Sequence, residues 1–154
     1  MYDEFGYMNA PIPETNIEIK RTAELKLALR NFLAGCGASC QEDESNRDIL
    51  KCYSKLQNGI CVEQEIHVGD SDYLCYTNLP GRVNCEDTQA VTDLILAAND
   101  INRELRYGNF EVDRTGGTVR FRSFYEPGNE IRLEELDRLL GEPFWAIENY
   151  GHIF

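Results

Sequence analysis

An alternating run near the middle of the chain most limits what this sequence can form. One set of alternate positions is largely apolar and the other is polar or small: Ile60, Val62, Gln64, Ile66 and Val68 against Cys61, Glu63, Glu65 and His67. A period of two places successive side chains on opposite faces of a strand. Asn58 and Gly59, directly before this run, are typical of a short hairpin turn. The pattern predicts that Ile60–Val68 pairs with a strand over Ile49–Leu56.

Further strands are predicted on both sides of this hairpin. Turn-prone segments at Glu44–Asp48 and Gly69–Asp72 separate it from short strands over Ala38–Glu42 and Tyr73–Thr77. The first region therefore holds three or four strands. A second hairpin is predicted later in the chain, where Gly116 and Gly117 join Asn109–Asp113 to Thr118–Tyr125.

Three segments have the 3.6-residue periodicity of amphipathic helices. The first spans roughly Ile17–Ala34. The second is expected to be capped by Asn84, and its apolar stripe runs from Val91 to Leu105. The third covers about Leu133–Leu140, is interrupted at Gly141–Pro143, and is expected to resume through Tyr150. The order α-β-β-β(-β)-α-β-β-α predicts an α+β fold in which helices pack on an antiparallel sheet.

Length and composition favour one folded domain. The chain has 154 residues, of which 42% are hydrophobic and 27% charged, and a chain of this size can bury about 70% of its unfolded surface without a metal or disulfide. Residues 1–16 contain two prolines and scattered aromatics without periodicity. We expect a flexible N-terminal arm over residues 1–16 and a single domain over residues 17–154.

The charge excludes several classes of partner. Fifteen Lys and Arg oppose 27 Asp and Glu, giving a formal net charge of −12. Such a surface repels phosphate backbones and anionic headgroups, so neither nucleic acid nor a membrane is an expected partner. No stretch approaches the roughly 20 apolar residues that span a bilayer. The acidic N-terminus also lacks the pattern of a secretory signal, which predicts a cytoplasmic protein.

Six cysteines are the main compositional oddity. In a cytoplasmic protein of this length, we expect free buried thiols rather than disulfides. Only Cys36 and Cys40 approach the spacing of a zinc-binding pair, and no second pair or nearby His accompanies them. The sequence therefore predicts no metal and no cofactor. A thiol or metal enzyme remains one possible function, but this possibility rests on cysteine number alone.

No catalytic residues are predicted. Cys61 and His67 share a strand face, but six residues at about 3.3 Å each separate them by roughly 20 Å. Gly116 and Gly117 lie in a hairpin without the helix and Lys that a phosphate-binding loop requires. We therefore expect a protein that is not an enzyme.

Aromatic residues near the C-terminus form the predicted protein-binding surface. They are Phe144, Trp145, Tyr150 and Phe154. Aromatic side chains provide large contact area at low entropic cost and are enriched in binding hot spots. A helix that closes the core would use the same residues, and the sequence does not decide between these roles.

Polar residues near the end of the second helix complete the candidate set. Arg103 and Arg106 could bind an acidic segment, or they could pair with local carboxylates. Asn99 and Asn102 lie one turn apart and are poor helix formers. We expect them to have a structural role, in which they bond backbone groups of a neighbouring hairpin or loop.

The segment Leu94–Val112, which contains Asn99-Asp100-Ile101-Asn102 and leads into the second hairpin, resembles the YbjN family, described as candidate bacterial sensory-transduction regulators. The fold of the YbjN family is similar to the fold of type III secretion chaperones. The resemblance implies a homodimeric, chaperone-like or regulatory domain without catalytic residues, which binds a protein or peptide. An acidic immunity or antitoxin-like protein that neutralises a basic partner is the alternative, because a net charge of −12 would steer such a partner.

Overall fold

The computed structural model describes residues 12–154, with side chains from residue 21 onward. The elements are α1 (Ile12–Gly35), β1 (Cys40–Glu42), β2 (Ile49–Lys55), β3 (Cys61–Val68), β4 (Tyr73–Asn78), α2 (Thr88–Asn102), β5 (Asn109–Asp113), β6 (Thr118–Tyr125), α3 (Leu133–Tyr150) and a 3₁₀ turn, η1 (Gly151–Ile153). The predicted α+β order is confirmed, with four strands between the first two helices. Residues 1–11 of the expected N-terminal arm lie outside the described residues.

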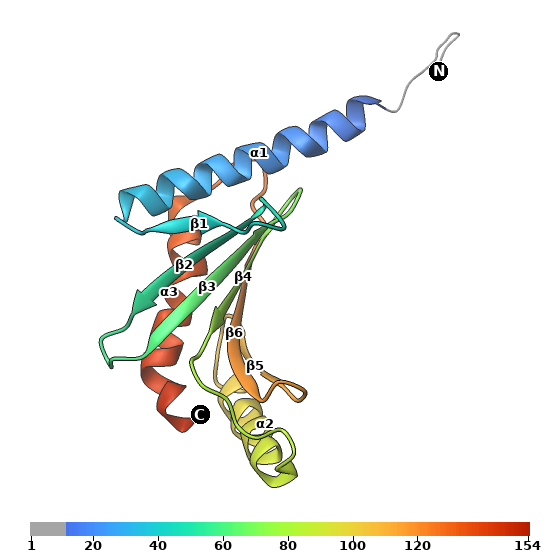
Figure 1. The fold of residues 1–154 in the computed structure, drawn as a ribbon. Coiled ribbons are helices and arrows are strands. Elements are labelled where there is room, and N and C mark those ends of the chain that lie inside the picture. Colours follow the sequence, from blue (N-terminus) through green and yellow to red (C-terminus); the bar gives the residue numbers. More distant parts are fainter. Residues whose placement is uncertain (1–11) are drawn as a thin grey trace.

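All six strands form one antiparallel sheet in the order β1-β2-β3-β4-β6-β5. The first four strands follow one another as a meander. The β5–β6 hairpin joins the sheet through β6, so that β5 becomes an edge strand (Figure 1). The two edge strands of the sheet are therefore β1 and β5.

Helices cover one face of this sheet and leave the other face open. The alternation that predicted β3 has the expected outcome, because Val62, Gln64, Ile66 and Val68 are buried while the intervening side chains are more accessible. α1 crosses the sheet near one end, α2 lies near the other, and α3 runs along the sheet between them (Figure 1). Tyr73 anchors α1, since its hydroxyl donates to the Leu25 carbonyl at 2.5 Å.

The core is divided into two clusters that share α3. The first joins α1 and strands β2 to β4 to the N-terminal half of α3, where Leu136, Leu139 and Leu140 are buried. The second joins α2, β5 and β6 to the C-terminal half of α3 through Ala146 and Ile147. α3 therefore determines how the two ends of the molecule are held together.

α3 is continuous, so the predicted interruption at Gly141–Pro143 is wrong. Pro143 has no N–H to donate to the carbonyl of Leu139, which would leave that buried carbonyl unpaired. The Ser123 hydroxyl donates to Leu139 O at 2.8 Å, and Gln64 Nε2 donates to the next carbonyl, Leu140 O, at 3.1 Å. Two buried polar side chains of the sheet thus donate hydrogen bonds to the helix carbonyls near Pro143.

The other two helices differ from prediction at their ends. α1 begins at Ile12 rather than Ile17. The N-cap of α2 is Asp87, whose carboxylate accepts from Ala90 N at 3.0 Å, and not the predicted Asn84. Asn84 instead accepts from Glu86 N in the preceding turn. α2 ends at Asn102, before Leu105.

A disulfide joins Cys40 of β1 to Cys52 of β2, so the expectation of six free thiols is wrong. The two residues are directly opposite each other in the antiparallel pair, with their Cα atoms 4.5 Å apart. Adjacent strands bring cysteines together that are twelve residues apart in the sequence, which spacing alone could not reveal. Of the four free cysteines, only Cys75 is buried, and burial raises the pKa of its thiol to about 12.

Candidate protein-binding groove

A groove lies between α3 and the connection from α2 to β5. We call it the α3 groove; its volume is about 670 Å³. The connection contributes Glu104, Leu105, Arg106 and Tyr107. The α3 side consists of Glu134, Asp137, Arg138, Gly141, Glu142, Trp145 and Ala146, and Phe121 of β6 also lines the groove.

Two aromatic side chains of this groove are exposed. Trp145 is 51% exposed and Tyr107 is 47% exposed. Trp145 lies beside the buried stripe of α3 and packs edge-on against Tyr150, with ring centroids 6.1 Å apart. Large exposed aromatic side chains provide contact area at low entropic cost. Two large aromatic side chains are therefore accessible at the groove.

The charge of the α3 groove is mostly negative. Its carboxylates are those of Glu104, Glu134, Asp137 and Glu142, and its cations are Arg106 and Arg138. Arg138 is already engaged, because its guanidinium donates to Glu135 at 2.5 Å and lies over the Tyr107 ring at 4.2 Å. Carboxylates therefore outnumber the uncommitted cation, which favours a partner segment with Lys or Arg.

A second, smaller hollow continues the groove toward β6. It has a volume of about 180 Å³ and shares Tyr107, Arg138 and Glu142 with the α3 groove. Its other side is formed by the end of β6, at Arg122, Ser123 and Phe124. The two hollows together thus extend along α3 to the end of β6.

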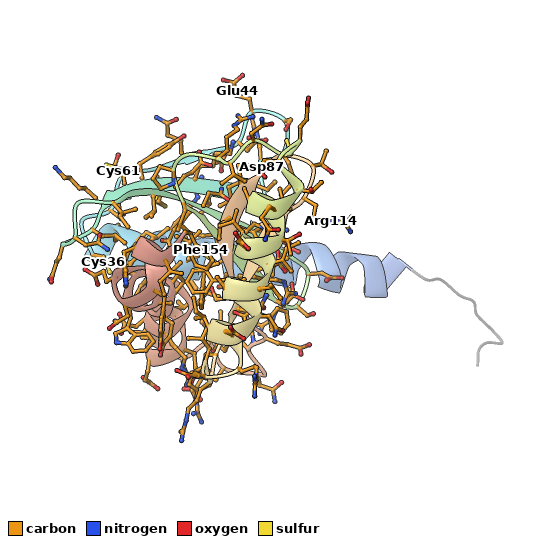
Figure 2. All side chains as sticks on the ribbon, turned by 90° about the horizontal axis from the view of Figure 1, so that it is seen from below. Cys36, Glu44, Cys61, Asp87, Arg114 and Phe154 are labelled. Atoms are coloured by element: carbon orange, nitrogen blue, oxygen red, sulfur yellow. A yellow bond between two sulfur atoms is a disulfide. The ribbon has the colours of Figure 1, made fainter. Side chains whose placement is uncertain are left out.

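The structure separates the four aromatics that the sequence grouped together. Only Trp145 lines the α3 groove. Phe144, Tyr150 and Phe154 are partly buried against the second core cluster. Phe154 packs on Phe110 with ring centroids 4.9 Å apart and lies between α2 and α3 in Figure 2. Those three side chains therefore help to close the core.

The two arginines and two asparagines also differ in their surroundings. Arg106 lines the α3 groove, whereas Arg103 is exposed at the end of α2. Asn102 bonds the backbone of β5 twice: its Nδ2 donates to Phe110 O at 2.9 Å, and its Oδ1 accepts from Phe110 N at 2.7 Å. The Asn99 side chain is exposed and has no hydrogen bond within the described part of the chain.

Sequence reasoning missed Tyr107, Glu142 and Phe124. Tyr107 precedes Gly108, which has a positive φ of 69°. An aromatic residue before a glycine at the start of a strand was the available signal, but the sequence does not show which surface it faces. Glu142 and Phe124 meet at the smaller hollow only because α3 packs beside β6.

Cys75 and His67 do not form a pair. Cys75 lies on the covered face of the sheet and pairs with Ile66, whereas His67 lies on the open face. His67 is instead in edge contact with Tyr76 and has Nε2 3.6 Å from Glu65 Oε1. Within residues 12–154, the structure contains no group of three or more His, Cys, Asp and Glu that could hold a metal ion.

None of the described helices is long and apolar enough to cross a membrane.

Comparison with known proteins gives a match at the level of the fold. No family model matches the chain, and no curated protein matches it. Among solved structures, it is similar to the crystal structure of YbjN from E. coli, described as "a putative transcription regulator". The TM-score is 0.59 at 17% identity, with 79% of this chain and 84% of that chain covered. The chain therefore has a mixed α+β fold similar to that of YbjN.

Proposed function

We propose that this chain is a non-enzymatic protein-binding domain with a chaperone-like or regulatory role, and that a segment of its partner binds in the α3 groove. The exposure of Trp145 and Tyr107 in that groove is the observation that carries the proposal. Large aromatic side chains gathered at a hollow are typical of binding surfaces. The similarity to YbjN is consistent with a binding or regulatory role.

Site-specific photo-cross-linking tests this proposal in cells. A photoreactive phenylalanine derivative would replace Trp145 in one variant and Tyr53 in another. Tyr53 is the matched control because it is also an exposed aromatic, at 67%, but lies in β2 away from the groove. We expect a discrete cross-linked protein from position 145 and none from position 53. Equal cross-linking at both positions, or cross-linking at position 53 alone, would contradict the proposed site.

A binding measurement then quantifies the groove. Once the partner is identified, Trp145→Ala is expected to weaken its affinity at least tenfold, because hot-spot aromatics commonly contribute about 2 kcal/mol or more. Phe144 is not a suitable control, since it packs against the core. Tyr53→Ala, which removes an exposed aromatic elsewhere, should leave the affinity unchanged.

The formal net charge of −12 favours a second candidate, an acidic immunity or antitoxin-like protein that neutralises a basic partner. The two functions predict different salt dependence. Long-range attraction is screened within about 8 Å at physiological ionic strength. An association rate that falls steeply with added salt would support the neutraliser, whereas a complex that forms equally fast in high salt would contradict it.

The proposal includes a homodimer whose partner is a protein or peptide rather than nucleic acid or a membrane. The resemblance of Leu94–Val112 to the YbjN family supports the dimer, and the acidic surface supports the class of partner. Sedimentation velocity over a range of protein concentrations tests the dimer directly. A single monomeric species at every concentration would contradict it.

A further inference from the structure

The β5–β6 pair stops before the end of β6. Its last partners are Asn109 and Arg122, although β6 continues to Tyr125. Gly108, with φ at 69°, turns the chain away from the sheet at this point. Its backbone lies so close to β6 that an added Cβ would be 2.6 Å from the Arg122 carbonyl oxygen. The position opposite Phe124, two residues beyond Arg122, is therefore left without a strand.

The register shows where the backbone groups of Phe124 point. In antiparallel pairs, successive residues direct their N–H and C=O to alternate sides of the strand. Leu79 N donates to Val119 O, so Val119 and the odd-numbered residues of β6 face β4. Phe124 consequently directs its N–H and C=O to the β5 side. Neither group has a hydrogen-bond partner within the described part of the chain.

The neighbouring part of this edge, at Phe110 of β5, is blocked. The outward N–H and C=O of Phe110 in β5 are both bonded by Asn102. An unpaired strand edge is a template for pairing with another chain, and native proteins commonly block it. The outward groups of Phe110 are thus bonded, whereas those of Val112 and Phe124 have no partner within the described residues. Phe124 is the one that lines the smaller hollow beside the α3 groove.

Charge and side-chain direction define what could fill the vacant position. A strand paired there would place the residue opposite Phe124 on the open face of the sheet, beside the half-exposed Phe124 ring. Its two neighbours would point to the opposite face, toward α3. There they would meet Glu142 and the Glu135–Arg138 pair, close to the acidic wall of the groove.

We propose that the partner segment binds in extended form, as a short antiparallel strand that pairs with Phe124 in the position that β5 leaves vacant. Its sequence places an apolar residue against Phe124 and basic residues on either side. This inference rests on the proposed function and specifies the partner of the same groove. Main-chain hydrogen bonds supply affinity in this binding mode, and alternate side chains supply specificity.

Three synthetic peptides test the inference against the full-length protein. The first alternates lysine and valine, the second alternates glutamate and valine, and the third is the lysine peptide with an N-methyl group on its central valine. We expect the first to bind saturably, the second not to bind, and the third to bind about tenfold more weakly because it lacks a backbone donor. Equal binding by the first and third peptides, or no binding by the first, would overturn the inference.

A pair of protein variants isolates the backbone contribution of Phe124. Phe124→Pro removes both the side chain and the N–H, whereas Phe124→Ala removes only the side chain. Proline is tolerated at a strand edge where the N–H faces solvent. We expect Phe124→Pro to bind the lysine peptide more weakly than Phe124→Ala, and equal affinities would contradict strand pairing. Amide hydrogen exchange of the wild-type protein keeps the test valid if the proline variant does not fold, because the Phe124 amide should become protected on binding.

The two levels of the hypothesis fail separately. A partner that cross-links to position 145 but leaves the Phe124 amide unprotected would preserve the groove and reject the added strand. Protection of the Phe124 amide together with cross-linking at position 145 would support both.

Discussion

The two edge strands of the sheet are held in place in different ways. At the β1 edge, the Cys40–Cys52 disulfide ties β1 to β2, and Glu42 forms ion pairs with Lys26 and Arg30 of α1. At the opposite edge, the Asn102 side chain bonds the backbone of Phe110. The attachment at the β1 edge is covalent. The attachment at the β5 edge consists of two hydrogen bonds, and the end of β6 beside it has no paired strand.

This difference separates a strongly attached edge from a more accessible one. A disulfide and the helix above it restrict movement at β1. The β5–β6 edge combines an accessible strand end with an exposed tryptophan and an acidic groove. Four changes test the comparison, taken in order of decreasing expected effect.

Removing the disulfide should have the largest effect on stability. The Cys40→Ala/Cys52→Ala double variant opens a loop with a sequence separation of twelve residues. Loop entropy of that size predicts a loss of about 3 kcal/mol in the free energy of unfolding. Urea denaturation measures the loss. Cys61→Ala, which removes an exposed free thiol, is the control and should unfold almost as the wild type does; equal stability of the double variant and this control would show that the covalent closure is unimportant.

Gly108→Ala should disturb the other edge. The positive φ of Gly108 disfavours any side chain, and an added Cβ would lie 2.4 Å from the buried Phe121 ring. We expect a loss of roughly 2–3 kcal/mol in unfolding free energy. Gly128→Ala is the control, because an added Cβ there meets no atom within 4 Å. Thermal denaturation compares the two, and similar melting temperatures would mean that the turn at Gly108 adjusts freely.

Asn102→Ala should remove the side-chain block on β5. It leaves the N–H of Phe110 without its partner and the C=O with only the 3.5 Å contact from Asn109 Nδ2, at a cost of about 2 kcal/mol. Asn99→Ala, one turn earlier on the exposed surface, should cost less than about 0.5 kcal/mol. Hydrogen exchange at the Phe110 amide provides a local readout. Unchanged protection of that amide in Asn102→Ala would show that the side chain does not close the edge.

The smallest effect is expected in the turn after β1. The Ser45 hydroxyl and then Lys51 hold the pKa of Asp43 at about 2, below its ordinary value of 3.8. A lowered folded-state pKa stabilises the protein fully above about pH 4, and this contribution is lost as pH falls through about 2. NMR titration of the wild type and Ser45→Ala tests the cause. The serine variant should raise the Asp43 pKa toward 3.8, and an unchanged value would exclude the hydroxyl as the main cause.

Local sequence signals predicted the strands well. The bounds of β5 and β6 match Asn109–Asp113 and Thr118–Tyr125, and the Asn58-Gly59 turn joins β2 to β3 as expected. These elements depend on alternation and turn chemistry, which are read within a few residues. The prediction for α3 was wrong because the fate of Pro143 depends on Ser123 and Gln64, which belong to distant strands.

The candidate groove was only partly predictable. Trp145 and Arg106 belonged to the surface predicted from the sequence, and both line the groove. Phe144, Tyr150 and Phe154 were grouped with them because the sequence shows aromatic character but not direction. Tyr107 and Phe124 enter the site only through the turn at Gly108 and the register of β6.

The sequence by itself determined the order of helices and strands and the face of each strand that would be buried, because periodicity is a local property of the chain. It also determined the acidic surface. Only the tertiary structure decided which strands became edges, which cysteines paired, and where a groove remained open. Those outcomes depend on contacts between residues far apart in the chain, such as Cys40 with Cys52 and Asn102 with Phe110, and the geometry of such contacts exists only once the sheet and helices have packed.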